Sequence, residues 1–108
     1  EKLRGLDGIT PPVEAPGCYH VFNQYTVRIS RRDEALPLLR ERQIGCAVYY
    51  PIPLHLQPCF RDLGYPKGSF PVTEQASNEV VSLPVYPELT CDQQDEVLAT
   101  LCEHLSKP

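Results

Sequence analysis

The chain has 108 residues, a length typical of one domain with a modest hydrophobic core. Its net charge of −4 at pH 7 and the lack of any long basic run argue against nucleic acid as a main partner. No apolar stretch approaches the roughly 20 residues that span a membrane, so we expect no membrane partner either.

The five cysteines are widely spaced, with no Cys-x-x-Cys pair of the kind that binds zinc. Cys46 and Cys102 fall within apolar patterns and are expected to be small core residues. The odd number of cysteines and the lack of a recognisable secretion signal favour a reduced, cytoplasmic protein.

The first strand is predicted at residues 19–29. Apolar and polar side chains alternate there, which places Val27 and Ile29 on one face of a sheet. The preceding residues 1–18 hold three prolines and three glycines and are expected to form an irregular lead-in or linker. The domain itself is therefore expected to span residues 19–108.

A helix is predicted at residues 30–43, with its true start near Asp33, because Pro37 is tolerated only early in a helix. Ser30 and Asp33 fit the capping box that begins many helices. Gly45 is expected to supply the turn that ends the helix. The apolar stripe that packs on the sheet consists of Ala35, Leu36 and Leu39.

The remaining predicted elements are a strand at 46–50, a short helix or turn at 55–63, a helix at 71–79, a strand at 80–85 and a helix at 90–105. The last helix has the clearest start signal, because Thr90 and Gln93 form a capping box. Short strands alternating with helices predict an α+β fold, with a small three-stranded sheet and helices packed on one face.

The most distinctive side chains lie in the stretch 46–60. An apolar strand runs into Pro51 and Pro53, which hold the chain extended and lead to His55. A strand that ends in a stiff loop bearing Tyr, His and Gln is a usual way to place polar groups at the edge of a site. The alternative is a proline-rich connector in which the tyrosines pack on the sheet and His55 is a surface or capping residue.

The sequence contains no self-sufficient catalytic set. It has no glycine-rich phosphate loop, no Gly-x-Ser-x-Gly motif and no metal-ligand cluster, so we assign no catalytic, cofactor-binding or metal-binding residue. His20 and His55 lie near predicted strand ends, where either is a candidate general acid or base, but a histidine without an identified partner is more often structural. His104 is expected at the surface, near the C-terminal end of the last helix.

Several motifs follow one another along residues 19–105. They are Tyr19-His20, Arg32-Asp33, Ile44-Gly45, Val48-Tyr49-Tyr50-Pro51-Ile52-Pro53-Leu54-His55-Leu56-Gln57 and Ser82-Leu83-Pro84-Val85-Tyr86-Pro87-Glu88-Leu89-Thr90. This combination resembles the C-terminal domain of the DegT/StrS sugar aminotransferase family, a group of fold-type I pyridoxal-phosphate enzymes.

The resemblance implies a reaction class and a larger protein. The family transfers an amino group, usually from glutamate, to a keto sugar on a nucleotide carrier, for surface polysaccharide or antibiotic sugar pathways. Its members are homodimers whose cofactor lysine lies in a large N-terminal domain, which this chain lacks. Lys2, Lys67 and Lys107 lie in no matching motif. We therefore expect no pyridoxal phosphate on this chain and no activity from it alone.

By resemblance, Tyr49, Tyr50 and His55 border the active-site mouth and contact the nucleotide-sugar. Tyr49 stands where many members have His. Phenol and imidazole groups can donate hydrogen bonds to sugar hydroxyls or phosphate oxygens. The expected partners are the missing large domain or a second copy of the chain. The alternative function is a free-standing, non-enzymatic module of the same fold that binds a small molecule or associates with itself.

Overall fold

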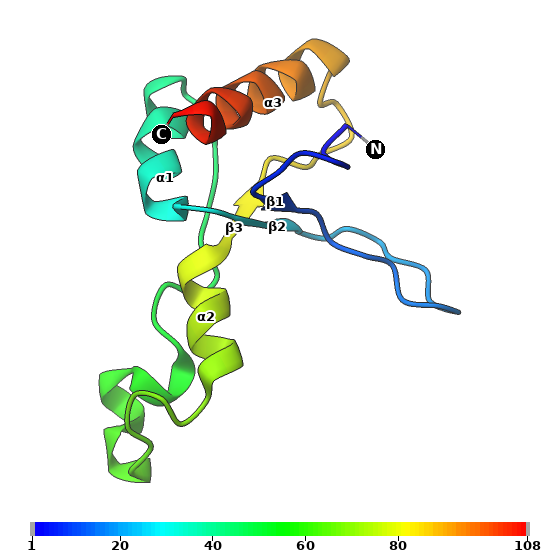
Figure 1. The fold of residues 1–108 in the computed structure, drawn as a ribbon. Helices are drawn as coiled ribbons and strands as arrows, with labels where there is room; N and C mark the ends of the chain where they lie inside the picture. The colour runs from blue at the N-terminus through cyan, green and yellow to red at the C-terminus, as the bar shows by residue number, and fades with distance from the viewer. Residues whose placement is uncertain (1, 108) are drawn as a thin grey trace.

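A computed structural model describes residues 2–107 and centres on a three-stranded antiparallel sheet (Figure 1). Glu1 and Pro108, the outer ends of the predicted lead-in and domain, lie outside the described residues. The strands are β1 (Ile9–Thr10), β2 (Tyr25–Ile29) and β3 (Val80–Leu83), in the order β1–β2–β3. Ile9 lies opposite Ile29 and Val27 opposite Val81, so the apolar residues of the strands share one face.

Two helices, α1 (Arg32–Glu41) and α3 (Cys91–Ser106), cover this apolar face. The core between them and the sheet consists of Ile9, Val27, Ile29, Ala35, Leu39, Ile44, Val81, Leu83 and Leu101. The predicted α+β class, with a three-stranded sheet and packed helices, is confirmed.

A third helix, α2 (Pro71–Glu79), lies beyond the end of the sheet and runs directly into β3 (Figure 1). The short 3-10 helices η1 (Leu54–Leu56) and η2 (Pro58–Leu63) lie beside it. We call residues 51–79 the lower lobe. This lobe follows the prediction closely, because α2 has its expected bounds and a helical turn was expected near residues 55–63.

Only the second half of the predicted strand 19–29 is a strand, because β3 ends opposite Tyr25 and β1 pairs only with the last two residues of β2. Residues 11–24 instead leave the sheet as an extended arm (Figure 1). Phe22 has a φ of 47°, which interrupts an extended strand. Tyr19 and Val21 are 88% and 76% exposed, so the apolar alternation of the arm is not buried within this chain.

Two segments that contribute to the sheet also differ from the prediction. Residues 1–18, expected to be irregular, contain β1, whose Ile9 belongs to the core. The predicted strand 46–50 is reduced to a single bridge, in which Ala47 and Ser82 exchange backbone hydrogen bonds of 2.7 and 3.2 Å. The prolines that follow the bridge have no N–H to donate, so the chain turns away from the sheet edge.

The ends of α1 are formed by residues other than the predicted ones. Arg31 precedes the helix in a left-handed conformation without a side-chain cap, and the Ser30 N–H donates to the Gly8 carbonyl at 2.8 Å. At the other end Gln43, with a φ of 57°, takes the left-handed conformation that Gly45 was expected to provide. The capping box expected at Ser30 is therefore wrong.

The molecule is more extended than a compact domain of its size. Its radius of gyration is 15.5 Å, against about 13 Å expected for a compact chain of this length. The arm and the lower lobe account for this shape, since both project from the sheet (Figure 1). Among residues 2–107, no helix combines the length and apolar character needed to cross a membrane.

Candidate functional site

Tyr49 and Tyr50 project from the sheet edge just beyond the bridge at Ala47. Their rings meet edge to face with centroids 6.1 Å apart, and the residues are 51% and 62% exposed. Both phenols are therefore available to a ligand or to another protein surface. The prediction that they contact a nucleotide-sugar stays a prediction.

His55 is a half-buried residue whose side chain is largely shielded and paired, which differs from both the surface role and the unpartnered role considered from the sequence. Its Nε2 lies 2.9 Å from Oε1 of Glu74, and the two side chains are 7% and 13% exposed. The Phe70 ring packs edge-on against the imidazole with centroids 4.9 Å apart. The proline corner thus delivers His55 to the first turn of α2, where Glu74 holds it.

Glu74 also holds the loop that closes over this pair. The Gly68 N–H donates to Oε1 at 2.7 Å, and the Phe70 N–H lies at 3.5 Å from the same atom. Burial by itself acts to raise the pKa of Glu74, but the hydrogen bonds from Gly68, His55 and Phe70 outweigh it and hold that pKa below its ordinary value. The carboxylate is therefore ionised at neutral pH.

A hollow of about 350 Å³ lies beside His55. Its wall consists of His55, Leu56, Gln57, Arg61, Gly64, Tyr65 and Pro66. The wall brings an imidazole, a guanidinium and a phenol together, which suits a ligand with several oxygen atoms. Sequence reasoning found His55 but missed Glu74, Arg61 and Tyr65. The helix start at Pro71 was the available signal for Glu74, since it placed that carboxylate in a first turn.

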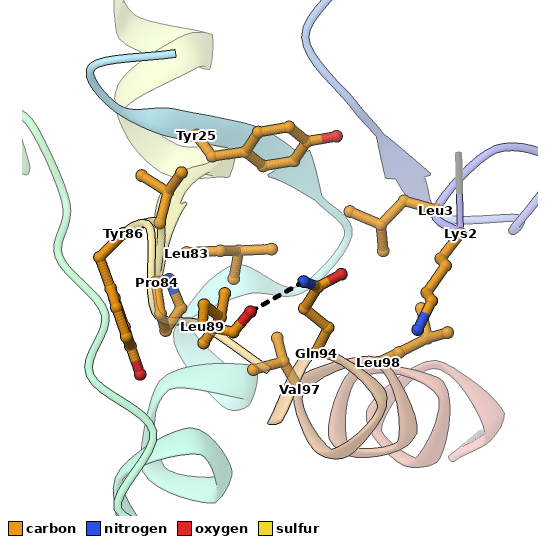
Figure 2. A pocket seen from close by; sticks show the side chains of 11 residues that line it. Lys2, Leu3, Tyr25, Leu83, Pro84, Tyr86, Leu89, Gln94, Val97 and Leu98 are labelled. Carbon is orange, nitrogen blue, oxygen red and sulfur yellow. Dashed lines mark hydrogen bonds between the residues drawn. The ribbon is translucent and has the colours of Figure 1, made fainter. Parts of the chain in front are cut away.

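A larger hollow, of about 460 Å³, lies between the helix-covered face of the sheet and the first half of α3 (Figure 2). Its wall consists mainly of apolar side chains from the segment before β1, from β2, β3 and α3, and from the segment after β3: Leu3, Tyr25, Leu83, Pro84, Val85, Tyr86, Leu89, Val97 and Leu98. Gln94 crosses it and donates to the Leu89 carbonyl at 3.3 Å. We call it the apolar hollow.

The lysines do not fit the role of a pyridoxal-phosphate anchor. Such a lysine must lose its proton to attack the cofactor aldehyde. Lys2 borders the apolar hollow, but its ammonium binds the Asp95 carboxylate, which raises the pKa of Lys2. Lys107 pairs with Glu103 at 3.3 Å, and Lys67 lies in an exposed loop. Within residues 2–107 there is also no group of three or more potential metal ligands.

The two other histidines have structural partners. His20 Nδ1 accepts the Phe22 N–H at 2.9 Å, and the two rings stack in the arm. His104 was expected at the surface, but it is 3% exposed and its Nε2 lies 2.9 Å from the Ser30 carbonyl. Its position near the helix end made it look exposed, whereas α3 turns that side toward the start of α1.

The fold defines a class of protein, because this α+β arrangement is shared with solved sugar aminotransferase chains. The chain belongs to the DegT/DnrJ/EryC1/StrS aminotransferase family, whose model matches residues 1–102. Members of this family are pyridoxal-phosphate-dependent aminotransferases.

Individual relatives and solved structures are similar to this chain over most of its length. DesV of S. venezuelae, solved in complex with a ketimine intermediate, superposes with a TM-score of 0.91 at 37% identity, covering 99% of this chain and 29% of that chain. The dTDP-3-amino-3,4,6-trideoxy-alpha-D-glucose transaminase of Micromonospora megalomicea subsp. nigra is 42% identical over 102 residues, 94% of this chain and 27% of that protein. A pleiotropic regulatory protein of Geobacillus stearothermophilus is 48% identical over 97 residues, 90% of this chain and 26% of that protein. The chain thus spans about a quarter of the length of the relatives it matches.

Proposed function

We propose that this chain is the substrate-side domain of a pyridoxal-phosphate-dependent nucleotide-sugar aminotransferase. The observation that carries the proposal is the superposition of nearly the whole chain on a solved aminotransferase at a TM-score of 0.91. Because none of its lysines fits the cofactor anchor, the chain orients the substrate while the rest of a longer protein holds the cofactor. The cofactor, when bound there, supplies the electron sink for amino-group transfer.

The lower lobe and the neighbouring pair Tyr49 and Tyr50 form the substrate-side wall in this proposal. Tyr49 and Tyr50 offer exposed phenols and ring faces, and His55 stands at a hollow shared with Arg61 and Tyr65. A nucleotide-sugar presents hydroxyls, phosphates and an aromatic base, which these groups match.

The apolar hollow and the arm are the docking surfaces in the same proposal. An apolar hollow open to water is typical of a surface that another protein part covers. The longer protein then works as a cytoplasmic homodimer in surface polysaccharide or antibiotic sugar synthesis.

A chimera tests the proposal. This chain would replace the matching 102 residues of the Micromonospora transaminase. We expect the chimera to bind pyridoxal phosphate, seen by absorbance, and to transaminate. His55→Ala should lower kcat/KM about threefold to tenfold, the value of one hydrogen bond, with the cofactor absorbance unchanged. Gln75→Ala, on the exposed face of α2, is the control. A folded chimera without activity would reject the proposal.

One observation favours the alternative of a non-enzymatic binding module: a relative 48% identical over 97 residues is named a pleiotropic regulatory protein. Light scattering on the 108-residue chain, with pyridoxal phosphate absorbance recorded, separates the two functions. A well-defined dimer that leaves the cofactor spectrum unchanged would favour the module. A monomer or loose aggregate with an unchanged spectrum would favour the aminotransferase domain.

A further inference from the structure

Three segments of the lower lobe meet at one oxygen atom of Glu74. Its Oε1 lies 2.9 Å from Nε2 of His55, which belongs to η1. The same atom accepts a hydrogen bond of 2.7 Å from the Gly68 N–H in the following loop. The Phe70 N–H, at 3.5 Å, comes from the residue that precedes α2. The first turn of a helix favours a negative charge, so Glu74 is well placed to stay ionised.

An ionised carboxylate fixes the proton of the ring that faces it. Because a carboxylate only accepts hydrogen bonds, His55 must carry a proton on Nε2 to make the 2.9 Å contact with Glu74. Phe70 packs edge-on against the ring and limits its rotation. The two backbone N–H groups on the same oxygen keep the carboxylate itself from turning away.

The other ring nitrogen, Nδ1, is left for a ligand. It has no hydrogen-bond partner among residues 2–107. The same part of the chain has no fully buried side-chain nitrogen or oxygen that lacks a partner, so Nδ1 is not fully buried. The imidazole lines the 350 Å³ hollow, and a neutral ring protonated on Nε2 presents a lone pair at Nδ1.

We infer that Glu74 is a positioning residue: it fixes the His55 proton on Nε2 and thereby selects a ligand group that donates a hydrogen bond to Nδ1. The inference rests on the proposed function and narrows it, because a neutral His55 ring with its proton on Nε2 accepts from a sugar hydroxyl and cannot donate from Nδ1 to a phosphate oxygen. Arg61 and Tyr65 line the same hollow and can donate to acceptor oxygens of that ligand.

Nitrogen-15 NMR of the full chain at mildly alkaline pH, where histidine is neutral, tests the positioning step. We expect His55 to be protonated on Nε2, with that proton protected from exchange with water. Glu74→Ala removes the acceptor and should speed the exchange about tenfold or more, the effect of losing one hydrogen bond to a charged group. Glu79→Gln, on the same helix, should change nothing.

Glu74→Gln keeps the test decisive if Glu74→Ala loosens the lobe. The glutamine side chain retains one carbonyl oxygen, which the N–H groups of Gly68 and Phe70 hold toward His55, so the Nε2 proton should persist. A proton on Nδ1 in the wild-type chain or in Glu74→Gln would overturn the inference. Unchanged protection in a folded Glu74→Ala chain would overturn it as well.

Titration with dTDP-glucose tests the ligand step. We expect the Nδ1 resonance to shift on binding, and the affinity to fall about threefold to tenfold in Glu74→Ala. If resonances elsewhere in the lower lobe shift while the Nδ1 resonance stays unchanged, the inference is overturned and the proposed function is left intact. The absence of any shift in the lobe would count against both.

Discussion

Arg32 joins two parts of the molecule through one side chain. It is 5% exposed, and its guanidinium donates to the Val80 carbonyl at 2.7 Å and the Ser77 carbonyl at 2.8 Å. Those carbonyls lie where α2 runs into β3, whereas Arg32 is the first residue of α1. The planar guanidinium has several fixed donors and can serve both carbonyls at once.

Replacing Arg32 should therefore be costly. Arg32→Ala leaves two buried carbonyls without partners, and we expect the free energy of unfolding to fall by about 3 kcal/mol. Arg32→Lys has no planar fork and should also lower the free energy of unfolding. Because it keeps a charged donor, the decrease should be smaller than for Arg32→Ala. Urea unfolding measures both. Arg28→Ala breaks an exposed pair with Glu79 and should cost about 0–1 kcal/mol. Equal losses for Arg32→Ala and Arg28→Ala would show that Arg32 is not a structural link.

At the level of elements, α3 is stabilised by the cap that its sequence predicts. Thr90 Oγ1 accepts the Gln93 N–H at 3.2 Å, and the Gln93 side chain accepts the Thr90 N–H at 2.9 Å. Thr90→Ala should lower the free energy of unfolding by about 1 kcal/mol. Thr73→Ala, at an exposed position in the first turn of α2, should stay within about 0.5 kcal/mol of wild type. Thermal unfolding followed by circular dichroism compares them, and similar melting temperatures would contradict the role of the cap.

The contact between α1 and α3 should depend on pH through Glu103. Hydrogen bonds from Arg42 and Lys107 hold the pKa of Glu103 below its ordinary value of 4.5. A carboxyl whose pKa is lower in the folded state stabilises the fold above that ordinary value. This contribution disappears as the pH falls through the folded-state pKa.

We therefore expect Glu103→Gln to be less stable than wild type at neutral pH and to lose less stability on acidification below about pH 4.5. Urea midpoints measured from neutral pH to about pH 3 test this. Part of the acid dependence should remain, because the pKa of Glu74 is lowered too. Glu96→Gln, on the same helix, should keep the wild-type profile. Parallel profiles for Glu103→Gln and wild type would disprove the link.

The elements that local signals specify were predictable, and those that depend on distant partners were not. α2 and α3 carry their own start signals at Pro71 and Thr90. The arm residues 11–24 have strand-like alternation in their second half but no partner strand among residues 2–107. The site divides in the same way: the prolines mark His55, but its contact with Glu74, 19 residues later, depends on how the intervening loop folds back.

For the whole molecule, the exposed surface is larger than a self-contained domain needs. The accessible area is 7705 Å², against about 6,100 Å² for a compact monomer of 12.2 kDa. The difference, about 1,600 Å², is roughly twice the area of about 800 Å² that one partner contributes to a standard protein interface. Among the exposed large apolar side chains, Tyr19 and Val21 lie on the arm and Tyr86 lies at the apolar hollow, the two surfaces proposed to meet the rest of a longer protein.

A charge placed in the apolar hollow tests this. Leu98 lines the hollow, and Ala99, the next residue of α3, is exposed and does not. In the chimera, Leu98→Lys should weaken docking by about 2–3 kcal/mol, because an apolar contact is lost and a charge is desolvated. The amount of cofactor-loaded, active chimera should fall more than about tenfold. Ala99→Lys should behave like the unmodified chimera. In the isolated chain, Leu98→Lys should reduce self-association measured by light scattering. Equal behaviour of the two variants would place the docking surface elsewhere.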